Sequence, residues 1–251
     1  MISVRHYTTI DSTNLEAHRL YAKGERGPLF LLADEQTAGK GRLDRNWVSA
    51  RGNCYSTLLL PLHADTANGI AVVPQISFVV ALAVADVVRG LTPTEPKLKW
   101  PNDVLVGGAK IAGILSEVLS TNPLTVAIGC GINVAHAPAG LAYSATCINA
   151  EGAPTERDIV FQTYRAALAK WLALWNNGVN FAAIRQAWVH QAIGIGETAS
   201  MTIGTQHLTG TFEGLTEQGA VILKPVVGPP HILHAGDLHI PSLARLRNGN
   251  K

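Results

Sequence analysis

Apolar and polar positions follow two periods along the first ninety residues of the chain. Residues 2–7 alternate with the period of a strand, and two apolar runs further on have the length of buried strands. Between the first predicted strand and the first of these runs, a Thr13-x-x-Glu16 pattern predicts the start of a helix that stops near Gly24. Pro74 is suited to the first turn of a long apolar helix. We expect strands at 2–7, 29–35 and 55–62, and helices at 13–24 and 74–90.

The middle of the chain is predicted to be mostly strands. Gly107-Gly108 between two apolar segments is a strong signal for a two-residue hairpin turn. Asn122-Pro123 marks a second turn, and residues 135–150 have the composition of a loop. We expect strands at 97–100, 104–106, 110–119 and 125–134.

The last hundred residues change from helical to strand-like patterning. Large apolar residues recur at helical spacing after Thr155-x-x-Asp158, which predicts a helix whose stripe packs into a core, and a shorter helix covers 181–192. Short strands with Gly turns follow, at 199–203, 208–213, 220–224, 232–234 and 238–240. We therefore predict an α+β fold with a main domain at 1–193 and a small β-barrel at 194–251.

Composition excludes several classes of protein. The chain has 251 residues, 47% hydrophobic content and a formal charge of +2, which implies no broad attraction to nucleic acid or membrane. Its three cysteines are odd in number and far apart, so we expect reduced thiols and a cytoplasmic setting. The N-terminus carries no apolar signal core, and polar residues interrupt the apolar stretch 70–88, which predicts a buried helix rather than a membrane span.

The segment Ala38–Trp47 is the first candidate for chemistry. It follows a predicted strand and combines two glycines with Lys40, Arg42 and Arg45. Glycine lets a backbone approach a ligand, and the cations can hold phosphate or carboxylate oxygens. Trp47 can cap an apolar ligand. Such a loop is often only a solvated connection, so the interpretation depends on the rest of the chain.

Four other segments add polar groups at element ends, each with a plain structural alternative. Asp11–Asn14 offers hydroxyls and an amide at a helix start, or is a simple cap. Lys99–Asp103 ends in an amide and a carboxylate, suited to Mg²⁺ beside phosphates, or is an ordinary turn. Lys110 heads an apolar strand and points into a site or to solvent. Ile128–Asn133 allows close approach of a flat ligand, or is a tight strand turn.

Three familiar motifs are rejected. Gly39-x-Gly41-x-x-Asp44 lacks the third glycine of a dinucleotide fingerprint and does not lead into a helix, and Gly129-x-Gly131-x-x-Val134 fails in the same way. The sequence contains neither a P-loop nor a Gly-x-Ser-x-Gly elbow, which argues against a P-loop NTPase and against acyl transfer through a serine.

Taken together, these segments resemble the biotin–protein ligases, over about residues 5–240. The matching motifs occur in the family's order and spacing: Ser12-Thr13-Asn14, Gln36 with Ala38–Trp47, Lys99–Asp103, Lys110–Leu115 and Gly129–Asn133. Where the family loop reads Gly-Arg-Gly-Arg-x-Gly-Arg, this chain has Lys40 for the first Arg and Asp44 for the last Gly. Lys keeps the charge but loses the planar fork, and Asp44 can alter loop closure.

The resemblance implies a mixed-sheet catalytic domain of the biotin/lipoate ligase type with a small C-terminal Src-homology-3-like β-barrel. It also implies that biotin and ATP form biotinyl-5'-AMP, from which biotin passes to a lysine of the biotin carboxyl carrier protein of acetyl-CoA carboxylase. Some family members carry an N-terminal helix-turn-helix; the roughly ten residues before Ser12 are too few for one, so we expect no DNA binding.

The resemblance also implies roles for single residues. Arg42 and Lys110 are the expected catalytic groups, and Asp103 is the expected Mg²⁺ ligand. The expected biotin contacts are Ser12, Thr13, Asn14, Gln36, Gly39, Lys40, Gly41, Arg42, Lys110 and Gly113. The expected nucleotide contacts are Arg42, Arg45, Trp47, Asn102, Asp103, Lys110 and Asn133.

Two other functions remain open at this point. A lipoate or octanoate ligase shares the adenylate logic, although the Ser12–Asn14 and Lys99–Asp103 motifs resemble the biotin branch. A non-catalytic biotin-binding regulator would not need Arg42, Asp103 and Lys110 together. The oligomeric state is also open, because an exposed strand edge can pair with a second copy, as a homodimer, or with the carrier.

Overall fold

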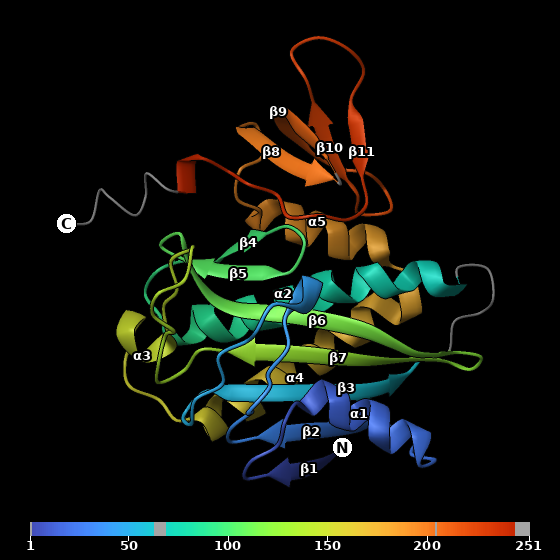
Figure 1. Ribbon diagram of the computed structural model, residues 1–251, viewed down its shortest axis with the longest axis vertical. Helices are drawn as coiled ribbons and strands as arrows, with labels where there is room; N and C mark the ends of the chain where they lie inside the picture. The colour runs from blue at the N-terminus through green and yellow to red at the C-terminus, as the bar shows by residue number, and fades with distance from the viewer. Residues whose placement is uncertain (1, 63–68, 204, 244–251) are drawn as a thin grey trace.

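The computed structural model describes residues 2–62, 69–203 and 205–243, and its centre is one large mixed sheet (Figure 1). The sheet has seven strands in the order β1-β2-β3-β7-β6-β5-β4. Only the β1–β2 pair is parallel, and the other five pairs are antiparallel. The strands are β1 Ser3–Tyr7, β2 Leu29–Ala33, β3 Cys54–Pro61, β4 Lys97–Lys99, β5 Asp103–Val106, β6 Ala109–Thr121 and β7 Leu124–Ile132.

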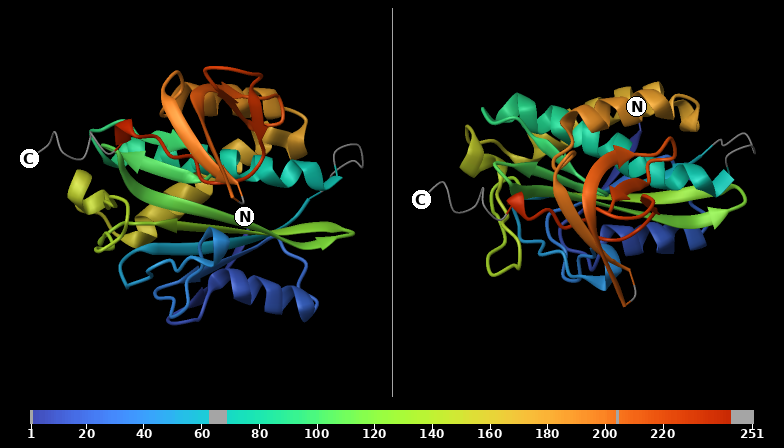
Figure 2. Two further views of the ribbon diagram at one scale, coloured as in Figure 1. Left: turned by 45° about the horizontal axis from the view of Figure 1, so that its top comes forward. Right: turned by 90° about the horizontal axis from the view of Figure 1, so that it is seen from above.

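Helices cover both faces of this sheet. Helix α1 (Thr13–Ala22) packs on β2, β3 and β7, while α2 (Val73–Leu91) lies on the opposite face against β6 and β7, with α4 (Arg157–Trp175) and α5 (Phe181–Gln191) beside it (Figure 2). The short elements are α3 (Ile148–Glu151) and three 3-10 turns at Arg42–Asp44, Gly69–Val72 and Asn176–Gly178. Because α1 covers only part of its face, loops at the strand ends complete that side.

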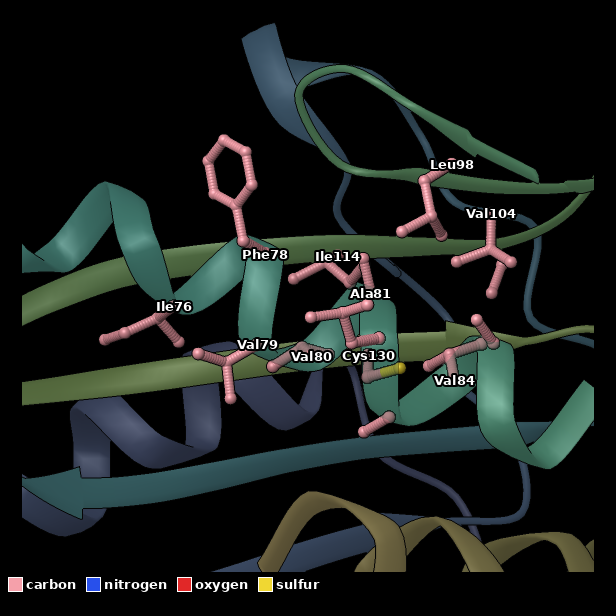
Figure 3. Packing of buried hydrophobic residues seen from close by; sticks show 14 of the residues in the cluster. Ile76, Phe78, Val79, Val80, Ala81, Val84, Leu98, Val104, Ile114 and Cys130 are labelled. Carbon is pink, nitrogen blue, oxygen red and sulfur yellow. The ribbon is translucent and has the colours of Figure 1, made fainter. Parts of the chain in front are cut away.

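The main core lies between α2 and the sheet. Twelve residues of α2 are buried, and Figure 3 shows several of them against Val104, Ile114 and Cys130 of the strands. By length and hydropathy this helix could cross a membrane, but 67% of its most apolar window is buried inside the protein. The apolar run at 70–88 is therefore a core helix, as its interrupting polar residues predict. Cys54, Cys130 and Cys147 are buried free thiols.

A second sheet of four antiparallel strands sits beyond α5. Its order is β11-β10-β9-β8, from β8 Thr198–Ile203, β9 Gln206–Leu215, β10 Val221–Lys224 and β11 His231–Leu233. The chain then runs back along β8, where Ser200 and His239 form a single bridge. Trp100 Nε1 donates a 3.1 Å hydrogen bond to the Gly219 carbonyl and so ties this small barrel to the main sheet. The predicted α+β class and small barrel are confirmed.

Four local predictions differ from the structure. Ser12, not Thr13, is the N-cap of α1, because its hydroxyl accepts the Leu15 N–H. Glu156, not Thr155, precedes α4 and makes no side-chain cap. The strand expected at 238–240 is only the Ser200–His239 bridge, since the segment 234–243 bends toward the main sheet instead of continuing a ladder. Within the expected loop 135–150, the last residues begin helix α3.

Candidate active site

Loops from one end of the main sheet and the segment after β11 enclose a cavity of about 330 Å³. Its walls carry two groups of polar side chains, which we name by their character. The neutral group consists of Ser12, Thr13, Asn14 and Gln36; the charged group consists of Lys40, Arg42, Arg45, Lys99, Asp103 and Lys110, with the Asn102 amide beside it. A cavity of this size suits one small ligand with both uncharged polar atoms and an anionic part.

The Gly-rich loop, residues 38–47, folds over the glycine-containing strands. Trp47 lies so close to Gly131 of β7 that a Cβ there would come within 2.5 Å of its Nε1, and a Cβ at Gly113 of β6 would come within 2.9 Å of its ring. Gly39 has the same constraint, because its Cβ would sit 2.4 Å from the Trp47 carbonyl. The indole of Trp47 therefore explains the glycines at 113 and 131, and the backbone carbonyl of the same residue explains Gly39.

Lys110 and Asp103 meet across the β5–β6 hairpin. Lys110 Nζ lies 2.6 Å from Asp103 Oδ1 as an ion pair without hydrogen-bond alignment, and both side chains are more than four-fifths buried. The ammonium also lies 5.2 Å from the Trp47 ring centroid and 5.3 Å from that of Tyr143. Lys110 therefore points into the cavity and does not snorkel to solvent.

Arg42 and Arg45 bring two more cations to this wall. Arg42 Nη1 lies 3.3 Å from Asn102 Oδ1 and 3.4 Å from Asp237 Oδ1, and Arg45 pairs with the same Asp237 carboxylate. Burial lowers the pKa of Lys99, which lines the same wall. Several cations around little negative charge make this part of the cavity a site for anions.

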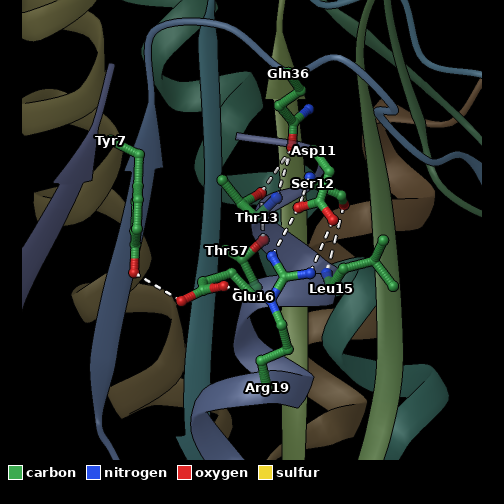
Figure 4. Close-up of polar contacts among 9 residues, drawn as sticks. All are labelled: Tyr7, Asp11, Ser12, Thr13, Leu15, Glu16, Arg19, Gln36 and Thr57. Carbon is green, nitrogen blue, oxygen red and sulfur yellow. Dashed lines mark hydrogen bonds and ion pairs between the residues drawn. The ribbon is translucent and has the colours of Figure 1, made fainter. Parts of the chain in front are cut away.

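The neutral group is held by hydrogen bonds at the start of α1 (Figure 4). Gln36 Oε1 accepts from the Thr13 N–H at 2.8 Å and from the Thr13 hydroxyl at 3.0 Å, while Gln36 Nε2 donates to Ser49 at 2.9 Å. Arg19 makes two hydrogen bonds to Asp11, at 2.8 and 2.7 Å, which hold the turn before the helix. These contacts fix the hydroxyl and amide groups before any ligand arrives.

Asn14 lies under the sheet glycines. A Cβ at Gly129 would come within 2.3 Å of Asn14 Oδ1, so the close packing of this amide requires glycine at that position. Thr57 Oγ1 is 2.6 Å from Asn14 Oδ1 and 2.7 Å from Thr13 Oγ1. The buried hydroxyl of β3 therefore links two members of the neutral group.

Most of the predicted site residues line this cavity: Ser12, Thr13, Asn14, Gln36, Lys40, Gly41, Arg42, Arg45, Trp47, Asn102, Asp103, Lys110 and Gly113. Two do not line it. Gly39 packs under Trp47, and Asn133 donates to the Thr146 carbonyl at 2.9 Å, which holds the loop after β7 against Lys110. Both therefore support the walls from behind. The side chain of Asp44 lies outside the described part of the chain.

Several residues without a predicted role also line the cavity: Lys99, Tyr143, Leu243 and the segment 237–240. Lys99 begins the Lys99–Asp103 motif, so its place at the site could have been predicted from the sequence. Tyr143 and Asp237 lie in stretches that look like ordinary loops, and only the folded chain brings them to the site. Asp237 is 195 residues from Arg42 in the chain.

The fold and cavity define a class of enzyme. Neutral hydrogen-bonding groups in one part and clustered cations in another suit a molecule with an uncharged polar ring and an acid group that meets phosphates. Enzymes that activate a carboxylate with a nucleotide need this arrangement.

Comparison with known proteins agrees with that class. Residues 7–133 match the model of the biotin/lipoate A/B protein ligase family. The biotin--[acetyl-CoA-carboxylase] ligase of Paracoccus denitrificans is 38% identical over 87% of this chain and 92% of its own, and the bifunctional ligase/repressor BirA of Bacillus subtilis is 30% identical over 92% and 72%. A biotin protein ligase from Aquifex aeolicus, solved with biotin and ATP, superimposes with a TM-score of 0.79 at 26% identity, covering 94% of this chain and 97% of that one.

The chain belongs to the biotin/lipoate A/B protein ligase family, and it is a ligase. The family resemblance and the enzyme class inferred from the sequence motifs are confirmed. So is the fold expected from that resemblance, a mixed sheet with a small C-terminal β domain.

Proposed function

We propose that this chain activates biotin with ATP to biotinyl-5'-AMP and transfers the biotin to a lysine of the biotin carboxyl carrier protein of acetyl-CoA carboxylase. One observation carries the proposal: Arg42, Asp103 and Lys110 line the same cavity as Ser12, Thr13 and Gln36. The names of the relatives from Paracoccus denitrificans and Aquifex aeolicus support the same substrates.

In the first step, an oxygen of the biotin carboxylate attacks the α-phosphorus of ATP and pyrophosphate leaves. The main physical barrier is to bring two anions together, and fixed cations lower it without reorganisation during the reaction. Lys110 binds the carboxylate and the oxygen that comes to bridge carbon and phosphorus. Arg42 and Arg45 bind phosphate oxygens, and Asn102 contacts the nucleotide.

The neutral group holds the ureido ring of biotin. The ring offers two N–H donors and one carbonyl acceptor. Gln36 Oε1 and the Thr13 hydroxyl provide oxygens for the donors, and the Ser12 hydroxyl provides a proton for the carbonyl. Trp47 and the apolar strands shield the ring and the valeryl chain. The dithiolane ring of lipoate has no donor for these oxygens, so the neutral group favours biotin over lipoate.

The carboxylate of Asp103 fits a magnesium ion that also binds the phosphates. Asp103 Oδ1 is buried and its one described partner is the Lys110 ammonium, with which it forms an ion pair, and Mg²⁺ in nucleotide enzymes often takes only one or two protein carboxylates. Its contribution when bound is to neutralise phosphate charge. No cluster of three or more His, Cys, Asp or Glu residues occurs within the described ranges, so Asp103 would hold the ion together with the phosphates.

In the second step, the carrier lysine attacks the acyl carbon of the mixed anhydride and AMP leaves. The Gly-rich loop covers the cavity and keeps water from the anhydride until the lysine arrives. Arg42 of this loop contacts Asp237, so the segment that follows the small barrel also helps to close the cavity. We also propose a cytoplasmic location, where the carrier is made, and the division between the two domains near residue 193.

Formation of AMP tests the proposal directly. The purified protein is supplied with Mg-ATP and the carrier domain, and with biotin, lipoate or neither. We expect AMP and a covalently biotinylated carrier only with biotin. AMP with lipoate in preference to biotin would assign the chain to lipoate chemistry, and tight biotin binding without AMP would indicate a non-catalytic regulator.

A further inference from the structure

Five residues from five neighbouring strands form one line across the main sheet, which we call the transverse row. Taken pair by pair, the row consists of Tyr55 of β3, Gly131 of β7, Gly113 of β6, Asp103 of β5 and Lys99 of β4 (Figure 1). Residues that lie directly opposite each other on paired strands point to the same face of a sheet. All five line the cavity. Lys99 therefore extends toward the cavity from the edge strand of the sheet.

The transverse row also gives the cavity an order. The neutral group lies toward the β3–β7 end, because Asn14 packs against Gly129 of β7. Lys110 Nζ lies over β6, 3.2 Å from the place that a Cβ at Gly113 would take. Strand β5 and then β4 follow, each about 4.8 Å further on. A ligand that lies along the row therefore passes from uncharged groups to Lys110 and ends at Lys99.

Lys99 differs from the cations around it because its ammonium has no partner. Lys110 pairs with Asp103, and the two arginines of the Gly-rich loop share Asp237. Within the described ranges, the half-buried Lys99 makes neither a hydrogen bond nor an ion pair. Burial lowers the pKa of Lys99, and the neighbouring cations lower it further against the attraction of Asp103. An ammonium in this setting is stabilised by an anion that the ligand brings.

Adenylation brings such an anion to this end of the row. An oxygen of the biotin carboxylate forms a bond to the α-phosphorus of ATP. The bond from that phosphorus to the oxygen shared with the β-phosphate breaks, and the oxygen leaves with the electron pair as part of pyrophosphate. The attacking and leaving oxygens lie roughly in line, on opposite sides of the phosphorus. Because Lys110 holds the carboxylate in the proposed mechanism, the leaving group lies further along the row, toward Lys99.

We propose that Lys99 is a further catalytic residue of the adenylation step: its ammonium binds the β- and γ-phosphates and stabilises the negative charge that builds on pyrophosphate as it leaves. The inference rests on the proposed function, because pyrophosphate leaves only when ATP is cleaved at the α-phosphorus. Lys99 has no part in the transfer of biotin to the carrier, since biotinyl-5'-AMP contains neither of these phosphates.

The test separates the two half-reactions and compares Lys99→Met with Lys97→Met. Lys97 is the matched control, because it lies two residues away on the same face of β4 but is exposed and does not line the cavity. Adenylation is measured as biotin-dependent pyrophosphate release at varied ATP. Its reverse is measured as ATP formed from biotinyl-5'-AMP and inorganic pyrophosphate. Transfer is measured with supplied biotinyl-5'-AMP and the carrier domain, and AMP is used as an inhibitor that lacks the β- and γ-phosphates.

We expect Lys99→Met to lower kcat/KM for ATP in adenylation roughly tenfold to a hundredfold, the effect of losing one charged hydrogen bond. The KM for pyrophosphate in the reverse reaction rises by a similar factor. The affinity for biotin, the inhibition by AMP and the rate of transfer stay unchanged, and unchanged transfer also shows that the variant is folded. Lys97→Met keeps wild-type values in every assay.

Three results would overturn the inference while the wild type still makes AMP from biotin. The first is an unchanged KM for pyrophosphate in Lys99→Met. The second is an equal loss of transfer or of AMP inhibition, which would place Lys99 at the α-phosphate or give it a general structural role. The third is the same loss in Lys97→Met, which would indicate only an effect of net charge. A wild type that makes no AMP from biotin would overturn the proposed function, and this inference with it.

Discussion

The Asp237 carboxylate and the Arg42 guanidinium approach within 3.4 Å, although one lies after the last strand of the small barrel and the other in the Gly-rich loop. Arg42 also donates to the Gly236 carbonyl at 3.1 Å, and Arg45 pairs with the second Asp237 oxygen. The barrel segment is therefore part of the cationic wall that we propose binds the nucleotide. Its contacts hold the two arginines in place before phosphates arrive.

Asp237→Ala tests that link. Without the carboxylate, the two guanidinium groups lose their common anchor, and the nucleotide must order them when it binds. We expect the KM for ATP to rise roughly threefold to tenfold and the affinity for biotin to stay unchanged, since a half-exposed ion pair contributes up to about 1 kcal/mol. Initial rates at varied ATP and at varied biotin measure both. Asp237→Glu, which keeps the charge, is the control; equal defects in both variants would contradict the anchor.

Lys110→Ala removes the cation nearest the proposed bridging oxygen. We expect biotin-dependent pyrophosphate release to fall roughly 10²–10³-fold, as for the loss of one electrostatic contributor to a transition state. Transfer from supplied biotinyl-5'-AMP to the carrier should fall less. Lys224→Ala is the matched control, because that ammonium only donates to the Gly228 carbonyl on the barrel. Near-normal pyrophosphate release would remove Lys110 from the mechanism.

Gly131→Ala tests whether Trp47 must pack directly against β7. The new Cβ would sit 2.5 Å from the indole nitrogen, so the ring and the loop that carries it must shift. We expect more hydrolysis of the anhydride, seen as several AMP molecules released for each carrier biotinylated. Gly90→Ala is the control: among the described residues, nothing outside the neighbouring turns of its own helix lies within 4 Å of the new Cβ, so carrier biotinylation should stay coupled to AMP release. Tight coupling in Gly131→Ala would show that loop closure tolerates the shift.

Lys99→Met separates stability from activity. Burial lowers the pKa of Lys99, so the folded protein holds this proton less tightly than the unfolded chain does. At neutral pH the charged amine therefore costs stability, and this cost fades as pH rises toward the ordinary lysine value. We expect the variant to melt about 2–4 °C higher at pH 7 and to adenylate more slowly.

The pH dependence provides the check on that prediction. The wild type should gain stability relative to Lys99→Met as the pH is raised toward 10, measured by thermal melts across the range. Lower thermal stability in the variant at pH 7 would mean that attraction to Asp103 outweighs the burial of the charge.

Local patterns predicted nearly every element of this fold. The periodic helices, the Gly107-Gly108 hairpin and the alternating strands lie within a few residues of their expected places, because each depends on neighbours in the chain. The exceptions were the caps at Ser12 and Glu156, the strand at 238–240 and the short helix α3 within the expected loop 135–150. The caps were misplaced by one residue, and the pairing of His239 depends on a remote strand, which a local pattern does not contain.

The site shows the same division. Charged residues within recognisable motifs, such as Arg42 and Lys110, could be found in the sequence because their residue types are unusual beside apolar strands. Tyr143 and Asp237 could not, since an aromatic or an acid in a loop has no distinguishing neighbour.

The return of the chain from the barrel to the nucleotide wall has a practical consequence. If the polypeptide were divided between α5 and β8, one fragment would keep the sheet with its cations, and the other would keep Asp237 and the missing wall. Neither fragment would contain all the residues that line the cavity. Biotin labelling by such a pair would then report when two fusion partners bring the halves together, which makes the gap between residues 191 and 198 the natural place to build a split reporter.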